Sequence, residues 1–89
     1  MLIICDKRSF RKDYRKLRSS GKDLSRLAFV IDTLATGESL AESYRDHALI
    51  GNYLGCRECH ISSDWLLIYQ TTETELILVR TGSHSELFG

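Results

Sequence analysis

Apolar residues follow a helical period in the first half of the chain and a strand-like pattern in its last third. Residues 1–5 form a short apolar run with the length of one strand. From 7 to 19, apolar side chains recur at helical spacing, and Gly21 follows where a C-terminal cap would stand. The same spacing predicts a second helix over 24–36, with Asp23 as its N-cap and a glycine just past its end.

The second half of the chain is predicted to consist of a loop and three strands. Residues 38–55 have a mixed composition with two glycines, which predicts a loop with at most one helical turn. Strands are predicted over 56–62, 65–71 and 75–81, joined by short turns. The middle strand is apolar on both faces, as a strand covered on both sides would be. The residues after 81 have the character of a short polar tail.

These elements predict an α+β fold with a short N-terminal strand, a two-helix hairpin and a three-stranded antiparallel meander, the helices packing on one sheet face. The length of 89 residues predicts a single domain, 1–89. No apolar run approaches the roughly 20 residues of a transmembrane helix, and the first residues do not form a signal peptide. We therefore expect a cytoplasmic protein with no membrane partner.

The charges are unevenly distributed although the net charge is zero. Residues 1–26 hold nine of the 12 basic side chains and three of the 12 acidic ones. On the first predicted helix the basic residues, Arg11 and Arg15 among them, lie opposite the apolar stripe. Two interpretations stay open: a solvated outer face, or a surface that faces phosphate groups.

The segment Cys56-Arg-Glu-Cys59-His60 has the C-x-x-C-H spacing of covalent haem attachment and of fragments of zinc sites. Haem attachment requires export, and a zinc site of this type would need a second ligand pair, for which only Cys5 remains. On a strand, Cys56 and Cys59 would also point to opposite faces. We therefore expect no metal and no other cofactor, and we interpret Cys59 as a small core residue.

Three histidines, His47, His60 and His84, are candidates for proton transfer in RNA cleavage. Attack by a ribose 2′-oxygen on the neighbouring phosphate needs a base, an acid and positive charge, and imidazoles with a pKa of about 6.5 suit the first two roles. A meander would bring His60, Asp64 and the tail together, and Asp64 would then orient a histidine or raise its pKa. Asp64 is equally typical of a plain turn residue.

Four further residues complete the candidate site. Arg57 and Arg80 suit phosphate oxygens, because a guanidinium group keeps its charge and donates two parallel hydrogen bonds. Trp65 and Phe88 offer aromatic faces for unstacked bases. Trp65 opens an apolar strand, however, and fits a core position equally well.

The segments that carry these residues resemble a known family, the YafQ-like branch of the RelE superfamily of toxins from bacterial type II toxin–antitoxin modules. The matching segments cover the C-terminal half nearly without gaps: Tyr44–Leu49, Gly51, Arg57–Ile61, Asp64–Tyr69 and Arg80–Phe88. The resemblance implies the microbial-ribonuclease (RelE-like) fold. It also implies a metal-independent endoribonuclease, an mRNA interferase that acts in the ribosomal A site and leaves a 2′,3′-cyclic phosphate or a 3′-phosphate.

The resemblance further implies a DNA-binding antitoxin of the DinJ or RelB kind, which silences the toxin and brings the complex to operator DNA. It places family function on His47, His60, Asp64, Trp65, His84 and Phe88. His84 is the first choice for proton transfer, with His60 and Asp64 assisting, and the division into base and acid stays open. Ser63 replaces a proline common in the family, and the zero net charge leaves affinity for ribosomal RNA to the first helix. The alternative is a non-catalytic RNA- or ribosome-binding module that blocks translation by occupancy.

Overall fold

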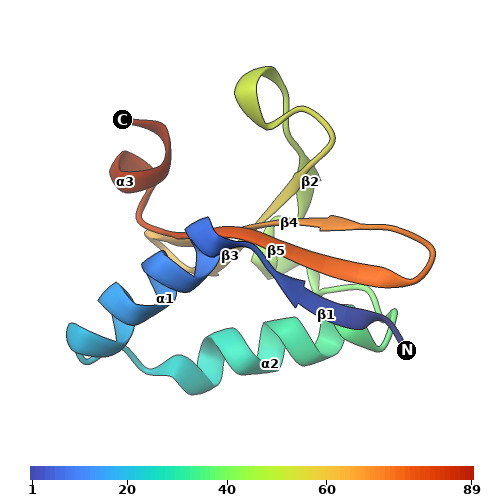
Figure 1. Cartoon of the computed structure of the whole chain (residues 1–89), viewed down its shortest axis with the longest axis horizontal. Coiled ribbons are helices and arrows are strands. Elements are labelled where there is room, and N and C mark those ends of the chain that lie inside the picture. Colours follow the sequence, from blue (N-terminus) through green and yellow to red (C-terminus); the bar gives the residue numbers. More distant parts are fainter.

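Two helices cover one face of a five-stranded sheet in the computed structural model, which describes residues 1–89 (Figure 1). The elements follow in the order β1 (Ile3–Asp6), α1 (Arg8–Ser19), α2 (Leu24–Ala35), the 3₁₀ turn η1 (Glu42–Tyr44), β2 (His47–Ala48), the 3₁₀ turn η2 (Gly51–Tyr53), β3 (Arg57–Ser62), β4 (Trp65–Thr71), β5 (Glu75–Gly82) and α3 (His84–Phe88). None of these helices has the length and apolar character that a membrane span requires.

The predicted helices and the predicted meander are confirmed, with ends that differ by at most two residues. Asp23 caps α2 as predicted, since its carboxylate accepts a hydrogen bond from the Ser25 N–H. Helix α1 ends in a Schellman turn, in which Gly21 has a φ of +79° and the Lys22 N–H donates to the Leu17 carbonyl. Local sequence signals therefore define where α1 ends and where α2 begins.

The sheet contains two strand pairings that the hydrophobic pattern does not reveal. Its order is β1-β5-β4-β3-β2. Strand β1 lies parallel to β5, with Ile3 opposite Glu75, so the first strand joins the last one. Strand β2 pairs antiparallel with β3 inside the segment predicted as a loop. A strand of two residues carries no period, which is why the pattern misses it.

The residues after β5 form a helix, so the prediction of a polar tail is wrong. Ser83 and Glu86 make a capping box at the start of α3: the Ser83 Oγ accepts from the Glu86 N–H, and the Glu86 carboxylate accepts from the Ser83 N–H. Leu87 is buried and holds α3 against the sheet. The Ser-x-x-Glu spacing was the available sign of this helix.

The main core lies between the two long helices and the sheet, with Phe10, Leu27 and Leu67 among its members. Strand β4 is covered on both faces, as predicted, because Leu66 and Ile68 pack into a smaller cluster on the opposite face. That cluster is closed by α3 and by the turn after β2, which lie on the side of the sheet away from α1 and α2 (Figure 1). Each fully buried Leu or Ile contributes about 1.5–3 kcal/mol, so both layers stabilise the sheet.

Candidate active site

A row of paired residues crosses four strands on the sheet face opposite α1 and α2, which we call the site face. The pairs are His47 with Glu58, Glu58 with Ile68, and Ile68 with Arg80. Directly paired residues point to the same face, and Ile68 packs into the cluster on this face. Because strands lie about 4.8 Å apart, the row extends over about 14 Å. It brings an imidazole, a carboxylate and a guanidinium group onto one surface.

The neighbouring row places His60 and His84 on the same side of the sheet. His60 pairs with Leu66, and Leu66 pairs with Gly82, two residues before His84. Leu87 lies less than one helical turn beyond His84 and belongs to the same apolar cluster as Leu66. The fold therefore brings the imidazole groups of His60, from β3, and His84, from α3, to the same side of the sheet.

Asp64 anchors the start of α3 rather than the ring of His84. Its Oδ1 accepts a hydrogen bond from the His84 N–H at 3.0 Å. The exposed His84 ring lies instead against the Phe88 ring, with 5.0 Å between the centroids. The structure therefore does not show the direct contact between Asp64 and an imidazole that the sequence leads us to expect, and it makes Asp64 a positioning residue for His84.

Glu58 is a site residue that the sequence reasoning misses. It is only 4% exposed, and its Oε2 lies 2.9 Å from the Nε2 of His47, while its Oε1 has no hydrogen-bond partner. The His47 Nδ1 lies 2.7 Å from the Arg45 carbonyl oxygen. Both ring nitrogens of His47 thus face acceptors, and only the doubly protonated imidazolium donates to both. The available signal was strand alternation, which puts Glu58 on the same face as His60.

Arg80 is held on the site face by an acidic partner from α1. Its Nε and Nη2 donate to the two carboxylate oxygens of Asp13 at 2.6 and 3.2 Å. These hydrogen bonds raise the pKa of the Arg80 guanidinium above its ordinary value. The Nη1 of Arg80 points to the Tyr53 hydroxyl at 3.5 Å, so one edge of the group faces the aromatic side chains above the sheet.

Arg57 lies apart from this arrangement. It alternates with Glu58 along β3 and so shares the strand face of Cys59, which belongs to the main core. Its Nε donates to Asp46 at 3.0 Å, and the Tyr69 hydroxyl donates to the other oxygen of the same carboxylate at 2.7 Å. The structure thus gives Arg57 a structural partner and does not bring it to the site face, where the sequence-based hypothesis needs it.

The two predicted aromatic platforms differ in exposure. Trp65 is 3% exposed and its indole N–H donates to the Thr81 Oγ1 at 3.0 Å, so it serves the core and offers no open face for a base. Phe88 is 41% exposed and meets the Tyr53 ring edge-on, with 5.7 Å between the centroids. A stacking surface on the site face therefore comes from Phe88 and Tyr53.

The basic residues of α1 face two different ways. Arg11 and Arg15 border an apolar hollow between α1 and β1, and Arg11 donates to the Asp6 carbonyl oxygen at 2.8 Å. Lys12 and Lys16 line a different hollow, which contains Arg80. The part of α1 that borders the candidate site therefore carries lysines, whereas the predicted pair Arg11 and Arg15 lies away from it.

The cysteines of the C-x-x-C-H segment point to opposite faces, as predicted. Cys59 lies in the main core and Cys56 packs against the smaller cluster on the site face. Burial raises the pKa of the Cys59 thiol to about 12, which disfavours the thiolate that metal binding requires. Cys59 is therefore a core residue, as interpreted from the sequence.

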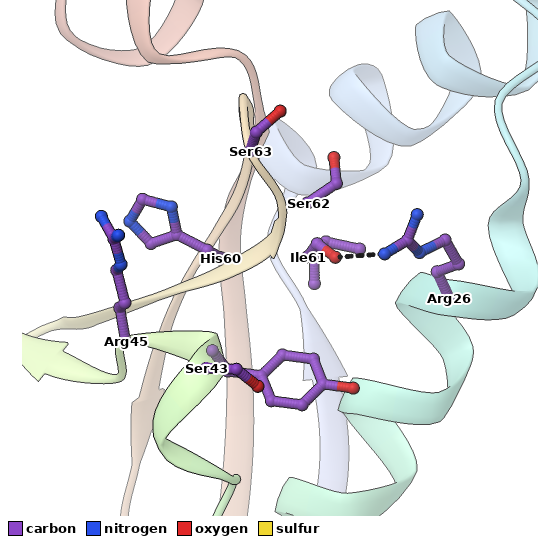
Figure 2. Close-up of a pocket in the computed structure, with 8 residues that line it drawn as sticks. Arg26, Ser43, Arg45, His60, Ile61, Ser62 and Ser63 are labelled. Atoms are coloured by element: carbon purple, nitrogen blue, oxygen red, sulfur yellow. Dashed lines mark hydrogen bonds between the residues drawn. The ribbon is translucent and has the colours of Figure 1, made fainter.

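His60 lines a pocket of about 390 Å³ at the end of β3 (Figure 2). Figure 2 shows the His60 ring beside Arg45, and Arg26 reaching toward the same strand from α2. We call this the β3-edge pocket, and its lining residues are Arg26, Ser43, Tyr44, Arg45, His60, Ile61, Ser62 and Ser63.

Comparisons with known proteins agree on one family. The family model of the bacterial toxin of type II toxin–antitoxin systems, YafQ, matches residues 3–89. The mRNA interferase toxin YafQ of Escherichia coli K12 is 36% identical over 81 residues, which are 90% of this chain and 88% of the relative.

Solved structures show the same fold. A copper-bound mutant toxin from Helicobacter pylori is 50% identical, with a TM-score of 0.93 over 99% of this chain and 100% of that chain. A structure of the E. coli DinJ–YafQ complex matches with 33% identity and a TM-score of 0.92 over 100% of both chains. These similarities confirm the predicted RelE-like α+β fold.

Proposed function

The chain belongs to the YafQ family of bacterial type II toxin–antitoxin toxins, and from this we propose that it is an endoribonuclease that cleaves mRNA. Its E. coli relative bears the name mRNA interferase. Within this chain, the observation that supports the proposal is that His47, His60 and Arg80 point to one sheet face, with His84 at its edge. A module that only occupies the ribosome has no need of several imidazole groups around one surface.

The proposed reaction is attack by the 2′-oxygen on the adjacent phosphate. A base removes the proton of the 2′-hydroxyl, the 2′-oxygen forms a bond to phosphorus, and the bond from phosphorus to the 5′-oxygen breaks. An acid gives a proton to the leaving 5′-oxygen, so the products are a 2′,3′-cyclic phosphate and a 5′-hydroxyl. Water can then open the cyclic ester to a 3′-phosphate. Each of the two proton transfers typically accelerates such a reaction by about 10²- to 10⁴-fold.

We assign one proton transfer to His84 and the other to His60. His84 is exposed and is anchored through its backbone by Asp64, so its ring can reach a bound strand. His47 is held between Glu58 and the Arg45 carbonyl, which suits a fixed positive charge better than a mobile proton carrier. Which of His84 and His60 starts as the base stays open.

Arg80 is the proposed source of positive charge for the crowded phosphate of the transition state. Asp13 fixes two of its nitrogen atoms and leaves the Nη1 edge toward Tyr53. A preorganised donor of this kind acts without reorganisation at the moment of reaction. Tyr53 and Phe88 then offer a stack for a base beside the cleaved bond.

The partners follow from the family. Because the E. coli relative was crystallised in the DinJ–YafQ complex, we propose a cognate antitoxin for this chain as well. Action on mRNA in the ribosomal A site, binding to operator DNA through the antitoxin complex, and a cytoplasmic location are parts of the same proposal. Contact with ribosomal RNA through α1, including Arg11 and Arg15, also belongs to it.

A metal has no step in this proposal. The Helicobacter pylori relative was crystallised with copper, so the donor set of this chain needs comparison. No three His, Cys, Asp or Glu side chains converge here as a metal site would require. His47 and Glu58 form a pair of possible donors, with 2.9 Å between Nε2 and Oε2.

The deciding experiment compares His84→Ala with the wild type on translating ribosomes, with transcript ends mapped by primer extension. Loss of cutting by at least about 10²-fold would support the catalytic role. The matched control is Ser85→Ala, an exposed neighbour on the same short helix, which should cut normally. If His84→Ala still stops translation without cutting mRNA, the protein acts by occupancy and the enzymatic proposal fails.

A further inference from the structure

The β3-edge pocket lies where the sheet edge is open. Strand β2 pairs only with Arg57 and Glu58, so the part of β3 from His60 onward has no neighbour on that side. Figure 2 shows Arg45 beside His60 on one side of this edge and Arg26 beside Ile61 on the other, with Ser63 in the turn that follows the strand. The pocket is thus a hollow beside a proposed proton-transfer residue.

The arginines of this pocket lack the acidic partners that the other arginines near the sheet have. Arg80 is paired with Asp13 and Arg57 with Asp46. Arg26 and Arg45 take part in none of the five ion pairs, which join Arg11–Asp6, Lys16–Glu86, His47–Glu58, Arg57–Asp46 and Arg80–Asp13. No acidic residue lines the pocket. Its positive charge is therefore available to a ligand.

The backbone conformation of Arg45 and one hydrogen bond of Arg26 bring the two side chains to the pocket. Arg45 is the one residue other than glycine with a positive φ, +51°, a conformation that costs energy and is often found at functional sites. Its carbonyl oxygen faces the His47 ring at 2.7 Å, which helps to hold that conformation. Arg26 donates from Nη2 to the Ile61 carbonyl at 3.2 Å, and the other N–H groups of its guanidinium have no partner in the protein.

We propose that the β3-edge pocket binds the backbone of the RNA substrate next to the cleaved phosphate, with Arg26 and Arg45 each contacting one phosphate of that backbone. The inference rests on the proposed function, because that function identifies RNA as the substrate. Guanidinium groups match phosphate oxygens in geometry, and the hydroxyl groups of Ser43, Ser62 and Ser63 add donors around them. A strand held here would lie against His60.

The same path continues to His84. Ser62 and Ser63 also line a second hollow, which contains Asp64 and Lys22. Asp64 holds the His84 N–H, and Lys22 has no acidic partner and lies with its Nζ 5.7 Å from the centre of the Trp65 ring. A single strand that follows Ser62 and Ser63 would therefore pass from the pocket to the proposed proton-transfer groups.

The test measures RNA binding without cleavage. The probe is a fluorescein-labelled hexanucleotide with 2′-O-methyl ribose throughout, which has no 2′-hydroxyl to attack. The full chain carries Arg26→Gln and Arg45→Gln together, since glutamine removes the charge and keeps an amide donor. We measure the dissociation constant of the probe by fluorescence anisotropy at salt concentrations between about 50 and 200 mM. The double variant should bind the probe at least tenfold more weakly than the wild type. The salt slope should fall by about 1.4, because each arginine contacts one phosphate and each lost contact lowers the slope by about 0.7.

The matched control is Arg8→Gln with Arg18→Gln, two exposed arginines of α1 outside the pocket and without ion pairs. This control removes the same number of positive charges. Equal losses of affinity for the probe in both double variants would mean that any positive charge on the surface attracts RNA, and would overturn the proposed pocket. Unchanged binding by the pocket variant would overturn it as well. Should Arg26→Gln prevent folding, Arg45→Gln alone carries the test, because the Arg45 side chain makes no hydrogen bond to the protein.

The two proposals fail in different ways. If the wild type never cuts mRNA and the pocket variant still loses affinity for the probe, the enzymatic function falls and an RNA-binding pocket remains. If the wild type cuts mRNA and the pocket variant binds the probe and cuts as the wild type does, only the pocket falls.

Discussion

Glu58 and His47 face each other across β2 and β3, with 2.9 Å between Oε2 and Nε2, and the other oxygen of Glu58 is buried without a partner. A carboxylate in that position depends on the hydrogen-bonding group beside it, because a buried polar atom without a partner is costly. Their pairing also holds β2, a strand of only two residues, against the sheet.

A double-mutant cycle of His47→Gln and Glu58→Gln should show this dependence. We expect each single variant to be less stable than the wild type, and the double variant to recover a coupling free energy of about 1 kcal/mol. The value is modest because half of the His47 side chain is exposed to solvent. Urea unfolding monitored by Trp65 fluorescence measures it. Strictly additive effects would show that the pair does not support β2.

Asp64 variants should separate positioning from proton transfer. Asp64→Ala removes the acceptor of the His84 N–H, so we expect cleavage to fall by about 10- to 100-fold through displacement of His84. Asp64→Asn keeps an acceptor oxygen and should retain most activity. If Asn proves as damaging as Ala, the carboxylate charge itself takes part in the reaction. Initial rates on one mRNA substrate provide the comparison.

The two aromatic residues should respond in opposite ways. Trp65→Phe loses the hydrogen bond to Thr81 and should lower the free energy of unfolding by about 1 kcal/mol, with cutting per folded molecule unchanged. Phe88→Ala should weaken RNA binding by about 1–3 kcal/mol, the worth of one stacked base, with little effect on stability. Thermal unfolding and binding of the 2′-O-methyl hexanucleotide check both. A Trp65→Phe protein that folds normally but binds RNA poorly would restore the platform role.

Acid should loosen α3 through Glu86. The hydrogen bond from Lys16, followed by those from Ser83, lowers the pKa of Glu86 to about 2. Since the folded pKa lies below the unfolded one, this stabilisation is complete above about pH 4.5 and is lost as the pH falls toward 2. With much of the side chain exposed, we expect about 1 kcal/mol. Unfolding of Glu86→Gln and wild type should differ by this amount at pH 6 and converge near pH 2.

Removal of metal should leave the activity intact. Toxin treated with EDTA and then dialysed should cut mRNA on ribosomes at the wild-type rate, because the proposed proton transfers use imidazole groups alone. A metal-dependent ribonuclease treated in the same way serves as the control and should lose activity. Recovery of a lost activity by added copper or zinc would instead assign the reaction to a bound metal.

Much of the fold is visible in the sequence, because a helix or a strand of six or more residues carries its own period. The two long helices and the meander are of this kind. The pairing of β1 with β5 is not, since it joins Ile3 to Glu75 through contacts that no local pattern encodes. Helix α3 lies between these cases: its Ser83-x-x-Glu86 spacing is a readable signal, although the helix has only five residues.

The candidate site was predictable in its residue types and less so in their partners. His60 and His84 reach one face because β3, β4 and β5 are consecutive strands, which a meander implies. The partner of Arg80 is Asp13, 67 positions away, and only the packing of α1 against β5 reveals it. The sequence does not single out Glu58, because an acidic residue inside a strand usually faces solvent, whereas here its side chain is buried and contacts His47 of the paired strand.

The parallel pairing of β1 with β5 bears on the order in which the fold can be completed as the chain is synthesised. The first strand has no neighbour in the sheet until the last strand has been synthesised, and α3 with His84 follows later still. A growing chain that stops before β5 therefore has an incomplete sheet, with β1 unpaired. Ile3 and Glu75, 72 positions apart, must therefore meet before this edge of the sheet exists at all.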